Sequence, residues 1–267
     1  MTISIGTDGE FFIQHSEGSI LPSQQILTEL VGAKENPIVL DNGAFHRDNV
    51  LGEFAHPPAT TVTQFVHNIR AVLDEIQGKF LNDFDCSPLF VPSHNMEWKH
   101  LAHPEAGVFG CDPEMCAYTG QNFPSPDVDE AGQFRSAGGH LHAGWEYETM
   151  SERLSAVVSA DIFVGLPAVL LDQQGTERKQ RLYGKAGACR LKPYGIEYRT
   201  LSNFWYQSDD LIRWAFNSMT TAIEKRFDVG DYLTDEETEQ RLQRIINTGD
   251  VKGAKILMAE WDIKEYL

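Results

Sequence analysis

The sequence predicts an α+β domain built on an antiparallel sheet. Three observations favour this class: strand-like segments with alternating apolar residues, separate helical segments that begin at N-capping residues, and no regular alternation of the two along the chain. Regular alternation would instead predict a parallel, doubly wound sheet. The chain has 267 residues, 42% of them hydrophobic and 23% charged, which is enough for a sizeable core. We expect one large domain over residues 1–230 and a helical appendage over residues 231–267.

Strand-like segments dominate the first half of the chain. Their residues are 2–13, 49–55, 107–118 and 139–145. The second segment reads NVLGEFA and is followed closely by two prolines, which end a strand. A helix is expected after these prolines, because apolar residues with helical spacing form one stripe: Phe65, Val66, Ile69, Val72, Leu73 and Ile76.

Helices dominate the second half, and side chains typical of N-caps precede them. These capping residues are Thr149 with Glu152, Ser208, and Thr234 with Glu237. Ser or Thr followed three residues later by Glu is a capping box, and Ser alone is a favoured N-cap. The first helix is predicted to run to about Gly165, the second covers residues 211–227, and the third carries Leu242, Ile245 and Ile246.

Charge and cysteine usage narrow the class of protein. The formal charge of −17 disfavours general nucleic-acid binding, because an acidic surface repels phosphate backbones. No apolar run approaches the ~20 residues of a membrane span, and the N-terminus shows no secretory signal. The four cysteines form no CxxC pair and are expected to be free thiols in a reducing cytoplasm.

Polar residues at spacing i, i+2 carry most of the functional information. A strand places i and i+2 on the same face, so each pair presents two functional groups from one side of a sheet. Carboxylates with imidazole suit Mg²⁺ or Mn²⁺ sites that share ligands with phosphate oxygens. The pairs are Asp8 with Glu10, His140 with His142, and Glu197 with Arg199, and Glu53 adds a carboxylate in an apolar strand.

A basic segment stands out in this acidic chain. Between residues 178 and 199 the only acid is Glu197, and three glycines allow close approach of the backbone to a ligand. Such a cluster is typical of a polyphosphate site. Its basic residues are Arg178, Lys179, Arg181, Lys185, Arg190, Lys192 and Arg199.

Each feature alone also has an ordinary structural interpretation. A DxE pair is commonly a solvated strand face, an ExR pair an ion pair, and a basic run a solvated loop. An HxH pair binds zinc as well as magnesium. Asp112 and Glu114 are either a second carboxylate pair or a strand edge. The joint occurrence of the pairs favours a metal and phosphate site.

Four segments in order resemble a known superfamily. GTDGEFF resembles the opening acidic strand of glutamine synthetases and glutamate–cysteine ligases, SAGGHLHAGW their HxH strand, and AGACRLKPYGIEYRTLSN their ExR segment. Together with LGEFAHPPATTVTQFVHNI, they are most similar to the phage-type COOH-NH2 ligases. The resemblance implies a glutamine synthetase-like catalytic domain, a curved antiparallel sheet with flanking helices, with ATP and the acid substrate at opposite ends.

The resemblance also implies roles for single residues. Glu10 and Glu53 would hold a metal near the acid substrate, and Asp8, His140 and Glu197 a metal on the ATP phosphates. Asp8 departs from the Glu that is usual in glutamine synthetase. The residues expected to contact the nucleotide are His142, Lys185, Arg190, Lys192 and Arg199, with Arg190 and Arg199 acting on the transferring phosphate. The ammonia-site residues of glutamine synthetase have no match, so glutamine synthesis is not implied.

The expected enzyme is a cytoplasmic, ATP-dependent carbon–nitrogen ligase, in the host cytoplasm if it is phage-encoded. It would use ATP and Mg²⁺ or Mn²⁺ to join a small-molecule or peptide carboxylate to an amine through an acyl phosphate, releasing ADP and phosphate. Two alternatives stay open: a zinc- or iron-dependent hydrolase or oxygenase that uses the HxH pair, and a non-catalytic nucleotide-binding relative. The oligomeric state is open, and a homo-oligomer is compatible with the sequence.

Overall fold

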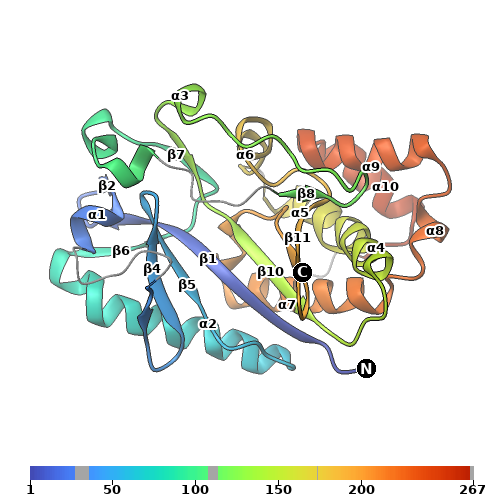
Figure 1. Ribbon diagram of the computed structural model, residues 1–267, viewed down its shortest axis with the longest axis horizontal. Helices are drawn as coiled ribbons and strands as arrows, with labels where there is room; N and C mark the ends of the chain where they lie inside the picture. The colour runs from blue at the N-terminus through green and yellow to red at the C-terminus, as the bar shows by residue number, and fades with distance from the viewer. Residues whose placement is uncertain (28–35, 108–113, 173, 265–267) are drawn as a thin grey trace.

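An antiparallel sheet forms the centre of the molecule in the computed structural model, which describes residues 1–27, 36–107, 114–172 and 174–264 (Figure 1). The main sheet has ten strands, and the path through eight of them is β3-β4-β5-β1-β10-β12-β11-β8, with β2 and β6 also paired to β1. All of these pairings are antiparallel, which confirms the α+β class. The strands are β1 (Ser4–His15), β2 (Ile20–Leu21), β3 (Ile38–Val39), β4 (Ala44–Asp48), β5 (Leu51–Ala55), β6 (Cys86–Leu89), β8 (Met115–Cys116), β10 (Gly139–Gly144), β11 (Ala188–Lys192) and β12 (Gly195–Tyr198).

The register of the sheet separates a polar face from an apolar face. Residues directly opposite each other in neighbouring strands point to the same side. Asp8 lies opposite His140, Glu10 opposite Glu53, and Glu197 opposite both His142 and Arg190. The alternate residues of the same strands form the other face, and they include Ile5, Phe11, Ile13, Phe54, Leu141 and Ile196, all completely buried.

Helices cover the apolar face. Helix α2 (Val62–Ile76) packs on β5, helix α7 (Asp209–Glu224) on β1 and β10, and helix α4 (Met150–Ala160) on β11 and β12. The stripe predicted for α2 is confirmed, because its six apolar residues are the buried side chains of this helix. The burial of these stripes against the sheet forms the main hydrophobic core.

The polar face is closed at one end by a second, smaller core. It consists of Phe12, Val50, Leu51, Met96, Ala106 and Ala137. Above it lies a two-stranded sheet, β7 (Ser93–Asn95) with β9 (Phe134–Ser136). Short helical turns connect these parts: α1 (Ser23–Ile26), η1 (Gln77–Leu81), η2 (Asn82–Phe84), η3 (Trp98–Leu101), η4 (Pro104–Gly107), α3 (Val128–Ala131) and η6 (Asn203–Gln207).

The helix that begins at Thr149 is longer than predicted. Thr149 is its N-cap and accepts from the backbone of Glu152, as expected. The chain stays helical through a π turn, η5 (Asp161–Gly165), into α5 (Leu166–Leu171). Gly165 therefore does not end the helix; a Cβ there would lie 2.4 Å from the Tyr198 hydroxyl, so this glycine allows close packing on β12.

The same helical run corrects the expectation that no apolar segment is long enough to span a membrane. Residues Met150–Leu171 are long and apolar enough by length and composition. Within the most apolar window, however, 72% of residues are buried inside the protein. A core helix of a folded domain passes the same test, and this one packs against α7 and β12.

The C-terminal residues form three helices. They are α8 (Val229–Tyr232), α9 (Glu236–Thr248) and α10 (Val251–Glu260), and Figure 1 shows them together at one end of the molecule. Helix α9 is capped by Asp235, whose carboxylate accepts from Thr238, so the predicted capping box at Thr234 is wrong by one residue. Helices α9 and α10 pack on α5, and α9 also packs on α6 (Thr176–Arg181). The domain boundary at residue 230 stays a prediction.

Of the strand predicted over residues 107–118, the described residues confirm a short piece, β8. Only Met115–Cys116 pairs with β11, while residues 108–113, and with them Asp112, lie outside the described residues. The chain turns back directly after this strand, because the N–H of Cys116 bonds to Gln121 and Gly120 adopts a positive φ of 68°. This reversal limits β8 to two residues.

Candidate active site

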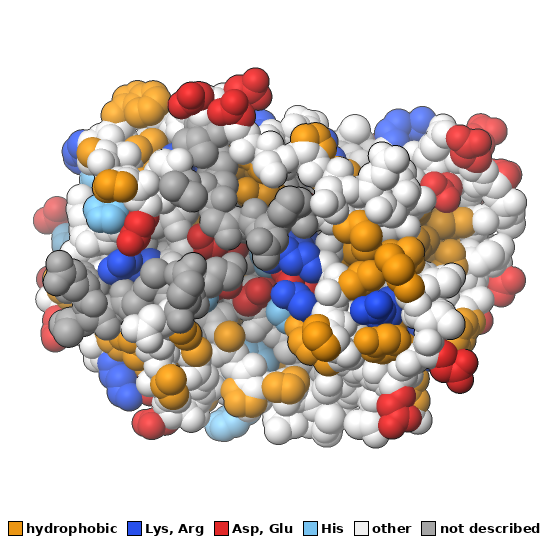
Figure 2. All heavy atoms as spheres, in the orientation of Figure 1, with side chains coloured by type: hydrophobic (Ala, Val, Ile, Leu, Met, Phe, Trp, Pro, Cys, Tyr) orange, Lys and Arg blue, Asp and Glu red, His pale blue; other side chains and the backbone are white. Residues whose placement is uncertain are grey.

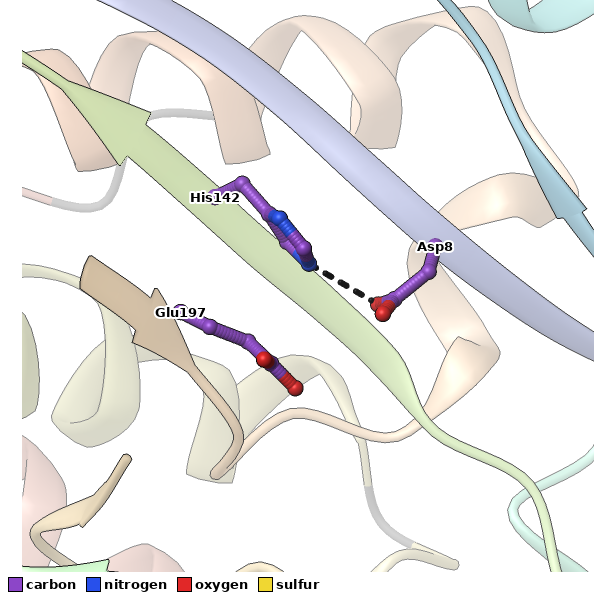
Figure 3. Close-up of side chains that lie close together, drawn as sticks. All are labelled: Asp8, His142 and Glu197. Atoms are coloured by element: carbon purple, nitrogen blue, oxygen red, sulfur yellow. Dashed lines mark ion pairs between the residues drawn. The ribbon is translucent and has the colours of Figure 1, made fainter. Parts of the chain in front are cut away.

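The polar face carries a first cluster of acidic and imidazole groups. Asp8 on β1, His142 on β10 and Glu197 on β12 each offer a ligand atom, and these atoms lie within 4.8 Å of one another. Figure 3 shows the three side chains converging from neighbouring strands, with His142 Nε2 3.2 Å from Asp8 Oδ1. Two carboxylates and an imidazole at this spacing match the oxygen and nitrogen ligands that divalent cations use.

His140 lies two residues before His142 on the same face of β10, and it reaches the same two carboxylates. Its Nδ1 is 3.1 Å from Asp8 Oδ1 and 3.8 Å from Glu197 Oε1. Burial and Arg199 lower the pKa of His140. The pKa of His142 is raised, because the pull of Asp8 outweighs the opposing effect of burial. The structure thus places both histidines at the cluster, and the assignment of the metal to His140 stays a prediction.

Basic side chains surround Glu197, which is completely buried. Its Oε1 accepts from Arg199 and lies 3.2 Å from Arg190 Nη1, and its Oε2 lies 2.8 Å from Lys192 Nζ. Burial and Asp8 raise the pKa of Glu197, but Arg199 and the two histidines outweigh them and lower it to about 2. This carboxylate is therefore held ionised at neutral pH.

A second cluster lies further along β1. Glu10, Asp48 on β4 and Glu53 on β5 offer ligand atoms within 4.8 Å of one another, and His46 Nε2 is 3.1 Å from Glu53 Oε2. Glu10 and Glu53 were expected here, but sequence reasoning missed Asp48 and His46. Their signal was present: the two residues have the same i, i+2 spacing as the other pairs.

Crowded negative charge distinguishes this second cluster. Burial raises the pKa of Glu10 to about 8, and Asp48 and Glu53 add to this, while the N–H of Gly138 and the charge of Arg199 oppose it. Like carboxylates at such a spacing disfavour their joint ionisation. A divalent cation would remove this repulsion, so the donor set fits a metal ion.

A small cavity adjoins the second cluster. It is lined by Glu10, Asp48, His140 and three arginines, Arg135, Arg178 and Arg199. All three arginines are at most 3% exposed. Arg199 Nε also donates to Glu114 Oε1 at 2.7 Å. The cavity therefore offers cationic groups for an anionic ligand beside the carboxylates.

The basic segment does not form the single cluster that the sequence suggested. Arg190, Lys192 and Arg199 do reach the polar face, whereas Lys179 is buried and donates to the Ile246 carbonyl at 3.3 Å. Lys185 lies on the wall of a separate cavity. Gly184 and Gly187 have positive φ, and these turns direct the intervening residues away from the strand.

Figure 2 shows how these groups appear on the surface. Lys and Arg side chains lie next to Asp and Glu side chains near the centre of the displayed face, over the middle of the sheet. Hydrophobic side chains lie to one side of this centre, over α4. Opposite charges thus meet where the strand register brings the polar pairs together.

Comparison with known proteins supports a family assignment for part of the chain. Residues 130–244 match the family described as Phage phiEco32-like COOH.NH2 ligase-type 2. No curated protein matches the chain. A solved structure described as a novel glutamine synthase homolog is similar, with a TM-score of 0.39 and 12% sequence identity, over 97% of this chain and 67% of that chain. Over residues 130–244, which include β10, β11 and β12, the predicted resemblance to phage-type COOH-NH2 ligases is confirmed.

Proposed function

We propose that this protein is an ATP-dependent carboxylate–amine ligase. The observation that carries the proposal is the pair of candidate cation sites on one sheet face, with guanidinium groups beside both. The first contains Asp8 and Glu197 and the second contains Glu10 and Glu53. Two cation sites on one face suit a reaction in which both a polyphosphate and a carboxylate must be held.

The two clusters would divide the substrates between them. The first cluster, with Lys192 and His142, suits the phosphates of the nucleotide, because ammonium and imidazole groups surround it. The second cluster and the small arginine-lined cavity suit the acid substrate. Mg²⁺ or Mn²⁺ at these carboxylates would neutralise phosphate charge.

The reaction would proceed in two steps. A carboxylate oxygen of the acid forms a bond to the γ-phosphorus of ATP, and the bond to the bridging oxygen breaks, so that ADP leaves. The amine nitrogen then bonds to the acyl carbon, loses a proton and displaces phosphate. Arg199 and Arg190 both contact Glu197 Oε1, and there they can hold the oxygens of the transferring phosphoryl group.

The nucleotide product formed from ATP tests this mechanism. The purified chain would be incubated with ATP, Mg²⁺ and pools of carboxylic acids with hydroxylamine as the amine, and the products separated by chromatography and mass spectrometry. We expect ADP, phosphate and a hydroxamate that all require Mg²⁺. AMP with pyrophosphate would show adenylation instead, and no nucleotide turnover with any pool would contradict the ligase assignment.

The alternative of a zinc- or iron-dependent hydrolase or oxygenase can be tested on the same preparation. A zinc or iron hydrolase that uses the HxH pair would place both imidazoles on one ion. His142 forms the candidate group with Asp8 and Glu197, and His140 Nδ1 lies 3.1 Å from the same Asp8 carboxylate. Tightly bound zinc or iron by elemental analysis, with activity lost on chelation and restored by that metal, would favour the hydrolase or oxygenase. Nucleotide binding without turnover would favour the non-catalytic relative.

A further inference from the structure

A larger cavity lies next to the arginine-lined one. It has a volume of about 420 Å³, against about 30 Å³ for the inner cavity, and Tyr183 lines both. Its walls come from α3, from α6 and the residues after it, and from the chain around Phe123. The outer cavity therefore adjoins the inner one at Tyr183.

The linings of the two cavities differ in their balance of charge. The inner one is lined by three arginines, Arg135, Arg178 and Arg199, against two acids, Glu10 and Asp48. The outer one is lined by three carboxylates: Glu114, Asp127 and Glu130. Arg181 also lines it, but its guanidinium is 3.1 Å from Glu177. The inner cavity thus suits an anion and the outer cavity suits a cation.

Glu114 joins the outer cavity to the reacting groups. Its Oε1 lies 2.7 Å from Arg199 Nε, and Arg199 in turn donates to Glu197 in the first cluster. An ammonium group held at Glu114 would therefore lie next to the arginine that we assign to the transferring phosphoryl group. This is where an attacking amine is needed.

The outer cavity is much larger than ammonia requires. A molecule of that size needs a void of only about 10–15 Å³, whereas about 420 Å³ is available. Cavities of this size hold small organic ligands. Lys185 adds a cationic group to the wall. An anionic group on the ligand would find its partner there.

We infer that the outer cavity is the amine site and that the amine is an amino acid or a short peptide. Its ammonium group would lie at Glu114, with Asp127 and Glu130 attracting it, and its carboxylate would pair with Lys185. The inference rests on the proposed ligase function. It specifies the class of the second substrate, which that function leaves open.

Ligand-observed NMR on the full chain with Mg²⁺ and ADP tests this inference. The probes are the proteinogenic amino acids, glycylglycine, and matched amines without a carboxylate, such as ethylamine for alanine. We expect binding of one or more amino acids or the dipeptide, with the matched amines weaker. The double variant Asp127→Asn, Glu130→Gln should weaken this binding roughly threefold to tenfold, since water screens these exposed charges. Lys185→Gln should remove the preference for a carboxylate.

Asp129→Asn is the matched control, because Asp129 is exposed in the same short helix α3 and does not line the cavity. It should leave binding unchanged. Two outcomes would overturn the inference while the ligase proposal stands. In one, the chain binds Mg²⁺–ADP but no amino acid or dipeptide. In the other, the double variant binds the amino acid or dipeptide as tightly as the unaltered chain. Failure of the unaltered chain to bind Mg²⁺–ADP would contradict the ligase proposal and the amine site with it.

Discussion

The two carboxylate clusters on the polar face differ in how their charge is balanced. In the first, Arg199, Arg190 and Lys192 surround Glu197, and its pKa is lowered to about 2. In the second, burial and neighbouring acids raise the pKa of Glu10 to about 8. The first cluster is ionised and organised without a metal, whereas the second reaches its full charge only when a cation is bound. We therefore expect the second cluster to couple metal binding to pH and to stability.

Arg199→Lys should have the largest effect, because Arg199 links the two clusters. It bonds to Glu197 and Glu114, and it opposes the raised pKa of Glu10. Lys keeps the charge but loses the planar fork that contacts several partners. We expect the rate of ADP release to fall roughly 10²–10³-fold under saturating ATP.

A thermal melt must accompany that measurement, because Arg199 is buried and the loss of a buried partner destabilises a fold. A lost rate with a retained melt supports a role on the phosphoryl group. An unchanged rate with an unchanged melt would remove Arg199 from the site. Arg190→Lys is a second variant for the same question, since Arg190 is more exposed and contacts the same Glu197 oxygen.

Gly138→Ala should disturb both clusters through one methyl group. A Cβ at Gly138 would lie 2.3 Å from His140 Nε2, and the Gly138 N–H donates to Glu10. The imidazole must move, and small displacements of catalytic groups are costly, so we expect a loss of roughly 10–100-fold in ADP release. Gly78→Ala is the control, because nothing lies within 4 Å of its Cβ and its activity should not change. Equal activity of the two variants would show that His140 is not needed where it lies.

Glu10→Gln separates the clusters by their response to pH. In metal-free protein, the pKa of Glu10 rises from 4.5 unfolded to about 8 folded. The folded state then binds more protons between these values, so this carboxyl makes the free energy of unfolding fall as pH rises from about 4.5 to 8. Glu10→Gln has no carboxyl at this position, so its free energy of unfolding should not fall in this way as the pH rises. We expect its Tm to gain roughly 5–10 °C relative to the unaltered protein across that interval, in chelator.

Adding Mg²⁺ sharpens the same experiment. At pH 8 the metal should stabilise the unaltered protein, whose Glu10 carboxylate it can bind, more than it stabilises Glu10→Gln. Melting curves for both proteins at several pH values, with chelator and with Mg²⁺, measure this difference. Parallel pH profiles in chelator would mean that burial and the neighbouring acids do not raise the pKa of Glu10 in the folded protein.

The sequence predicted the polar face better than it predicted the site. The i, i+2 spacing of Asp8 with Glu10 needs only the local alternation of a strand, which is why the shared face could be predicted. Asp48 has the same i, i+2 spacing with His46, but its approach to Glu10 depends on the β4–β5 hairpin and on the pairing of β5 to β1, which local spacing does not give. Lys185 lies at the outer cavity, between two glycines with positive φ, and its expected contact with the nucleotide stays a prediction. Long-range register and turn geometry decide such positions, and neither is visible in composition.

Asp209→Asn should have the smallest effect. It measures how much stability is lost when a paired carboxylate outside the two clusters is removed. Asp209 lies 2.8 Å from Arg70 Nε, on α7 and α2, and its side chain is 54% exposed. Water screens such a pair, so it contributes about 0–1 kcal/mol, and a charge in the first helical turn adds a similar amount.

We expect the Tm of Asp209→Asn to fall by no more than roughly 2–6 °C, with ADP release unchanged and no change in the effect of Mg²⁺. A change in Tm on adding Mg²⁺ that differs from that of the unaltered protein would mean that charges on the helices affect metal binding at the polar face. The distinct behaviour of Glu10 and Glu197 could then no longer be ascribed to their immediate neighbours.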